Sequence, residues 1–142
     1  MDLEARLAER GRALAEREAK HAPALARAHT LADSLHGLVA EALAAYHLET
    51  IAAPQLAVAL GPVRHDEKHL HAFEFDVRRG RHRAIVVVKS RGEATLVGPF
   101  HVGKDEGPCR RVPFAEDGSI SDELSDALGD LLEAFLEEAT AP

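Results

Sequence analysis

The spacing of apolar residues predicts a helix on each side of a central segment. From about Pro23 to His47, apolar positions recur at steps of three and four residues, which is the period of an amphipathic helix. These positions are Leu31, Leu35, Leu38, Val39, Ala42, Leu43 and Tyr46. The stretch from Ser119 to Ala139 repeats the same period, and Ser121 is a suitable N-cap for a helix there. We therefore expect both stretches to pack an apolar face against the rest of the chain.

The first 22 residues have the composition of a helix but a weaker apolar pattern. Three leucines fit a heptad seam in which an arginine takes the intervening place: Leu3, Leu7, Arg10 and Leu14. An isolated helix of this length is rarely stable in water, so the segment needs a partner surface. Because Pro23 is expected to break the chain, we predict two N-terminal helices, with residues 1–22 as a helical arm and residues 23–142 as a single α+β domain.

Between the helices, the apolar pattern has the period of β-strands. The predicted strands are 56–60, 70–77, 83–90, 93–100 and a short fifth strand at 109–114, with a loop over 103–108 before the last. Gly80 lies between the second and third strands and suits a hairpin turn. Successive strands joined by short turns form a meander. The predicted fold class is therefore α+β: two N-terminal helices, a four- to five-stranded antiparallel meander sheet, and a C-terminal amphipathic helix packed on the sheet.

The charge of the chain is unevenly distributed. Its 142 residues include 24 acidic and 17 basic side chains, a net charge of −7. Residues 64–111 hold 11 basic and 7 acidic residues, whereas residues 112–142 hold 9 acidic residues and no basic one. The predicted sheet is therefore basic and the C-terminal helix strongly acidic. A chain with this net charge is poorly suited to duplex DNA, which selects proteins with an excess of basic residues.

Four arginines surround the predicted hairpin turn: Arg78, Arg79, Arg81 and Arg83. Guanidinium groups bind phosphate and carboxylate well, so the hairpin is a candidate site for an anionic ligand, RNA or an acidic protein segment. The alternative is a solvated turn whose charge Asp76 and the acidic helix balance in part. Binding of single-stranded nucleic acid is disfavoured by the composition, because the chain has no Trp and one Tyr on which bases could stack.

Nine histidines give two further candidate sites. His69 and His71 share one face of a predicted strand, where they could bind a ligand at the rim of the core. His29, Asp33 and His36 share one face of the second helix, at a spacing that zinc ligands can have. No motif supplies the remaining ligands, and exposed histidines are expected on the polar face of a helix. We therefore predict no metal site and no cofactor.

The sequence has no recognisable catalytic motif. The only cysteine, Cys109, lies beside two arginines, a setting that can activate a thiol, but a lone cysteine in a small domain more often has a packing role. Nucleotide-binding, serine-hydrolase and zinc-protease motifs are absent from the sequence. No catalytic residue is therefore predicted.

The apolar surface favours a non-catalytic protein-binding module, such as an adaptor, chaperone, immunity or regulatory protein. Wide apolar stripes and an arm without a core role indicate a protein partner, including a second copy of the chain in a homodimer. One alternative is a small metal-dependent or thiol enzyme that uses the histidines and Cys109. The other is binding of RNA or another anionic ligand through residues 78–83. Neither a signal-peptide pattern nor an apolar stretch of about 20 residues occurs, so we expect a cytoplasmic protein without a membrane partner.

Overall fold

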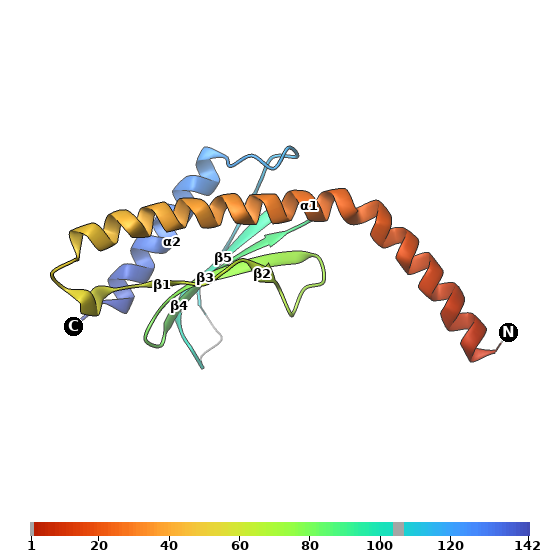
Figure 1. Cartoon of the computed structure of the whole chain (residues 1–142), viewed down its shortest axis with the longest axis horizontal. Helices are drawn as coiled ribbons and strands as arrows, with labels where there is room; N and C mark the ends of the chain where they lie inside the picture. Colours follow the sequence, from red (N-terminus) through yellow and green to blue (C-terminus); the bar gives the residue numbers. More distant parts are fainter. Residues whose placement is uncertain (1, 104–106) are drawn as a thin grey trace.

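The computed structural model describes residues 2–103 and 107–142, and it has two layers: two helices lie on one face of an antiparallel sheet (Figure 1). The elements follow in the order α1 (Leu3–Glu49), η1 (Pro54–Leu56), β1 (Ala59–Leu60), β2 (Arg64–His65), β3 (Ala72–Arg79), β4 (His82–Lys89), β5 (Glu93–His101), β6 (Cys109–Pro113) and α2 (Asp122–Ala139). The α+β class is confirmed. Among the described residues, no helix has the length and apolar character needed to cross a membrane.

The N-terminal part of the fold is one helix of 47 residues, α1, and not two helices. Asp2 caps its start by accepting the backbone N–H of Ala5 at 2.8 Å. Pro23 lies inside α1, so the prediction that it separates two helices was wrong. Proline removes one backbone donor and kinks a helix without having to end it, and the alanine-rich sequence on both sides favours the helical state. Figure 1 shows that α1 is bent and that the part before the bend points away from the sheet.

The sheet has six strands in the order β1-β3-β4-β5-β6, with β2 also paired to β3. Strands β3 to β6 form the predicted antiparallel meander, and Gly80, with a φ of +58°, lies in the turn between β3 and β4. Strands β1 and β2 follow one another along the same edge of β3, where Ala59 pairs with Arg78 and Arg64 with Glu74. This edge brings the segment around β2 beside the polar residues of β3.

The short strands differ most from the prediction. The predicted strand 56–60 is reduced to the two residues of β1, because Pro54–Leu56 forms a 3-10 turn. Strand β2 was not predicted, since two residues are too few to show an alternating pattern. Within the predicted loop 103–108, residues 104–106 lie outside the described residues.

The core lies between the two helices and one face of the sheet. Alternate strand residues point into it, because successive side chains of a strand lie on opposite faces. The strand residues of the core are Phe73, Phe75, Val77, Ala84, Val86, Val88, Ala94, Leu96 and Val112. The large helix residues are Leu31, Leu35, Val39 and Leu43 of α1, and Leu124, Leu128, Leu131 and Phe135 of α2. Leu38 and Ala42 of the predicted stripe are exposed. In the described part of the chain, no helix covers the opposite face of the sheet.

The N-cap of α2 provides a test of how this helix is stabilised. The Ser121 hydroxyl accepts the backbone N–H of Leu124 at 3.1 Å. We expect Ser121→Ala to lower the free energy of unfolding by about 1 kcal/mol, because the first turn of α2 loses this acceptor. Urea denaturation followed by circular dichroism measures the change. Ser125→Ala, at an exposed position of the same helix, is the control, and an equal loss in both variants would contradict the capping role.

Candidate functional site on the open face of the sheet

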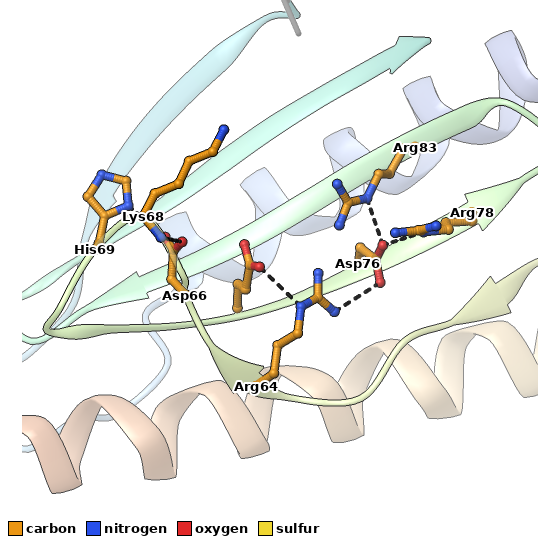
Figure 2. Close-up of polar contacts among 8 residues, drawn as sticks. Arg64, Asp66, Lys68, His69, Asp76, Arg78 and Arg83 are labelled. Atoms are coloured by element: carbon orange, nitrogen blue, oxygen red, sulfur yellow. Dashed lines mark hydrogen bonds and ion pairs between the residues drawn. The ribbon is translucent and has the colours of Figure 1, made fainter. Parts of the chain in front are cut away.

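Charged residues gather on the face of the sheet that points away from both helices. Glu74, Asp76 and Arg78 alternate with the core residues of β3, and Arg83 of β4 points to the same side. Arg64 of β2 joins them from the neighbouring strand. Figure 2 shows these side chains in front of the strands, with the ribbon of α2 behind the sheet. The three arginines and Asp76 are called the arginine cluster below.

Asp76 is the centre of the arginine cluster. Its side chain is 3% exposed, although aspartate is rarely buried unless it is paired. Asp76 Oδ2 accepts the Nε–H of Arg78 at 2.6 Å and the Nε–H of Arg83 at 2.7 Å. Arg64 Nη1 donates to Asp76 Oδ1 at 3.5 Å. One buried carboxylate therefore holds three guanidinium groups (Figure 2).

The pKa of Asp76 is set by opposing effects. Burial removes the carboxylate from water and, taken alone, raises its pKa. The hydrogen bonds and the positive charges of Arg78 and Arg83 together exceed this effect, so the pKa of Asp76 is lowered from its ordinary value. Asp76 is therefore ionised at neutral pH, and its charge keeps both arginines in position.

The arginines retain hydrogen-bond donors for another group. Asp76 is bound by the Nε atoms of Arg78 and Arg83, and their terminal Nη groups make no hydrogen bond to a described residue. Arg64 is used more fully, because its Nε also donates to Glu74 Oε1 at 3.1 Å. The arginine cluster and Glu74 together have three positive and two negative charges. The open face therefore presents oriented donors with a net positive charge.

Gly61, between β1 and β2, allows the chain to approach Asp76 closely. Its N–H donates to the carbonyl oxygen of Asp76 at 2.8 Å, and a Cβ at this position would overlap Asp76 Oδ1. His36 of α1 donates through Nε2 to the carbonyl oxygen of Gly61 at 3.0 Å. The segment that leads into Arg64 is thus attached both to α1 and to the arginine cluster.

An aspartate–histidine pair lies in the loop between β2 and β3, beside the arginine cluster (Figure 2). Asp66 is buried and accepts two hydrogen bonds, from the backbone N–H of Lys68 at 2.9 Å and from His69 Nδ1 at 2.6 Å. These contacts orient the imidazole of His69. Its Nε2 makes no hydrogen bond to a described residue and is available to a ligand.

A groove of about 480 Å³ connects the arginine cluster with this loop, and it is called the sheet groove below. Its volume lies within the range of small-molecule sites, about 300–1,000 Å³. Apolar side chains line it beside the charged ones: Ile85, Val87, Val97 and Phe100. A hollow of about 590 Å³ lies between α1 and residues 114–116, but its charged side chains (Arg27, Arg91 and Glu116) are all exposed. The sheet groove is the better candidate, because the fold has buried and fixed a charged group there.

The residues that the sequence singled out lie at different places. Arg78 and Arg83 meet in the arginine cluster, and His69 lies on the rim of the sheet groove. Arg81 is exposed in the turn between β3 and β4. Cys109 is exposed on β6, outside the residues that line the sheet groove.

Arg79 contacts the backbone of two other elements. Its Nη1 donates to the carbonyl oxygen of Ala139 at 2.6 Å, and its Nε and Nη2 donate to that of Gln55 at 3.0 and 2.7 Å. A cation at this end of α2 is also favoured by the helix dipole. Arg79 therefore connects the end of α2 to η1, and it does not point to the open face.

His71 and His21 attach α1 to the sheet where β3 begins and β4 ends. His71 Nε2 lies 2.8 Å from Glu18 Oε1, and His21 Nε2 lies 2.6 Å from the hydroxyl oxygen of Ser90. The two imidazole rings are in contact, with centroids 4.3 Å apart. These four residues are called the latch below. His71 is therefore part of a contact between α1 and the sheet, and not of the sheet groove.

The three residues His29, Asp33 and His36 do not converge on one point. His29 stacks on Phe73, with ring centroids 4.3 Å apart, and lies 3.7 Å from Asp33. His36 is engaged with Gly61. Within residues 2–103 and 107–142, no group of three His, Cys, Asp or Glu side chains is arranged to hold a metal ion.

Arg64, Glu74 and Asp66 belong to the site, and the sequence did not identify them as site residues. Arg64 and Asp66 lie outside the predicted strands, and only the register of β2 on β3 brings Arg64 beside Glu74. The one signal in the sequence was Asp76, a carboxylate between apolar residues of a predicted strand and close to several arginines.

Comparisons of the chain with protein-family models, with curated proteins and with solved structures found no match. The function must therefore be inferred from the geometry of the site itself.

The role of Asp76 can be tested by Asp76→Asn. The pKa of Asp76 in the folded protein is lower than its value of about 3.9 in the unfolded chain. The carboxylate therefore stabilises the fold fully at pH values above about 3.9, and this contribution is lost as the pH falls through the folded pKa. We expect the variant to lose about 3 kcal/mol of unfolding free energy at neutral pH, because the arginines lose their buried partner. The difference from the wild type should shrink below about pH 4.

Chemical denaturation at a series of pH values measures this profile. Asp130→Asn removes an exposed carboxylate from α2 and should follow the wild-type profile. A deficit in Asp76→Asn that stays constant between neutral and acidic pH would contradict the assigned role.

Arg79 and Arg81 form a matched pair for a second test. Arg79→Ala should lower the free energy of unfolding by about 1–2 kcal/mol, because two carbonyl oxygens lose a charged donor. Arg81→Ala removes the same charge from the exposed turn and should leave the stability unchanged. Thermal unfolding compares the two, and similar losses in both variants would show that net charge, and not the contacts of Arg79, is responsible.

Proposed function

We propose that this protein binds a small organic anion in the sheet groove. The observation that carries the proposal is the arrangement of Arg78 and Arg83: one buried carboxylate fixes their Nε atoms, while their Nη groups keep unused donors. A guanidinium group that is already oriented loses little further conformational freedom when it binds a ligand. Such a pair can hold a carboxylate or a phosphate group through charge-assisted hydrogen bonds.

The distribution of charge favours an anion at one end of the groove. Three arginines face two carboxylates there, although the chain as a whole has a net charge of −7. The Arg83 side chain is 20% exposed, so its interaction with a ligand is screened less by water than that of a surface arginine. The loop at the other end has mixed charges, with Asp66, Glu67 and Lys68. The acidic group of the ligand is therefore assigned to Arg78 and Arg83.

The apolar lining favours an organic anion over an inorganic one. Ile85, Val97 and Phe100 lie beside the arginine cluster and can cover an apolar part of the ligand, at about 25 cal/mol per Å² buried. RNA is a poorer match, since binding a polyanion uses several separate phosphate contacts and this cluster offers a small net charge in one place. We assign the ligand as a carboxylate or phosphate joined to an aliphatic or aromatic group.

The lining of the groove offers charged and imidazole side chains that can bind an anion. Its described residues include no hydroxyl or thiol side chain. His69, oriented by Asp66, is suited to make a hydrogen bond with the ligand through Nε2.

Titration with phenyl phosphate and with benzoate, followed by NMR chemical shifts, tests the proposal. We expect saturable binding of at least one of them, and weaker binding of inorganic phosphate, which lacks the apolar part. Arg78→Ala should weaken binding by about tenfold or more, the loss expected for one charge-assisted hydrogen bond. Arg78 is the better position for substitution, because its side chain is 54% exposed and its loss disturbs the fold less than that of Arg83.

Arg81→Ala is the matched control, because it removes one arginine from the neighbouring turn without touching the groove. Benzyl alcohol serves as the neutral analogue and should not bind. The proposal fails if neither anion binds saturably, or if Arg78→Ala and Arg81→Ala weaken binding equally.

A further inference from the structure

The first part of α1 is a helix without support from the rest of the chain. Every residue from 2 to 17 is exposed, and Figure 1 shows this segment extending away from the sheet and α2. Leu3, Leu7 and Leu14 are 70%, 62% and 39% exposed. Residues 2–17 are called the exposed segment below. Exposed apolar side chains gathered along one helix commonly mark an interface.

The leucines of the exposed segment continue the stripe that packs α1 on the sheet. Leu7 and Leu14 are seven residues apart, and further steps of seven reach His21, Ala28 and Leu35. His21 contacts Ser90, and Ala28 and Leu35 are fully buried. One face of α1 is thus covered by the sheet from His21 onward, while no described residue covers it before Glu18.

The latch fixes the direction in which the exposed segment leaves the body. Glu18 and His21 are held by His71 and Ser90, shortly before Pro23 in α1. Contacts of α1 with the described part of the sheet end at this point, so the tip of the helix is presented to the solvent with its leucines uncovered.

We infer that the exposed segments of two copies pair along their leucines and form a homodimer. The segment has four acidic and four basic residues, so two segments meet without net repulsion, whereas each whole chain has a net charge of −7. A strongly acidic or basic partner gains no net attraction from such a segment. A second copy matches both its leucines and its balanced charge.

The two segments run in opposite directions. In a parallel pair, equal positions meet in the seam, and Arg10 lies against Arg10 of the second copy. In an antiparallel pair with Leu3 beside Leu14 of the second copy, Leu7 packs on the aliphatic part of Arg10, whose charge reaches the solvent. This arrangement buries the leucines of both copies and places the two bodies at opposite ends of the pair.

The paired length is short. About twelve residues overlap, which corresponds to roughly 18 Å at 1.5 Å per residue. An interface of this size is at the low end of specific protein contacts. The homodimer therefore dissociates on dilution, and its formation is measurable as a function of concentration.

Sedimentation velocity over about a hundredfold range of concentration tests the inference. For the wild type we expect the mass to rise from one chain toward two. Leu7→Glu should stay monomeric over the whole range, while Leu48→Glu should behave as the wild type, since Leu48 is 72% exposed at the other end of α1. Circular dichroism verifies that both variants are folded. A wild type that is monomeric throughout, or a Leu7→Glu variant that associates like the wild type, overturns the inference.

Disulfide formation tests the direction of pairing. In a Cys109→Ala background, chains with Leu3→Cys and chains with Leu14→Cys are mixed and oxidised. We expect the mixed disulfide to form in excess of either homodimeric one. A predominance of disulfides between two Leu3→Cys chains would overturn the antiparallel arrangement.

Discussion

Both helices pack on the same face of the sheet, and the other features of the molecule follow from this constraint. In β3 the core residues alternate with Glu74, Asp76 and Arg78, so covering one face of the sheet leaves a second face that carries these charges beside Ile85 and Val87 of β4. The length of α1 has a related effect. A helix of 47 residues spans roughly 70 Å, whereas strands of eight or nine residues span roughly 30 Å. Part of α1 must therefore extend beyond the sheet.

The arginine cluster is not the arrangement that stability alone would favour. Several charged groups are partly or fully removed from water around Asp76, and apolar side chains of similar volume are often as stable as such a cluster, or more so. The fold nevertheless accommodates it with a glycine at position 61, where a side chain would collide with Asp76. This local arrangement is easier to explain by a binding requirement than by a requirement of folding.

The elements with long, regular patterns were predictable from the sequence, and those fixed by tertiary contacts were not. Helix α2 and strand β3 show several periods of their pattern, β4 contains a continuous apolar run bounded by turns, and the N-cap at Ser121 is a local signal. Pro23 misled the prediction because a local rule describes the lost donor but not the helical propensity of the alanine-rich sequence on both sides.

The same distinction applies to the candidate site. Arg78 and Arg83 were identified because four arginines lie close together in residues 78–83. Arg79 was included with them, although strand alternation turns it to the opposite face. Arg64 and Asp66 could not be found, because their place depends on the register of a two-residue strand. His69 and His71 were expected to act on one face, yet one lies at the sheet groove and the other in the latch.

The loop between β2 and β3 connects the sheet groove to the latch. His69 and His71 are separated by one residue, so a few ångströms of chain join the rim of the sheet groove to the base of the exposed segment. If occupancy of the groove and pairing of the segments each select a position of the loop, thermodynamic linkage requires each to change the equilibrium constant of the other by the same factor. The short loop between the two histidines would then couple ligand affinity to dimer formation.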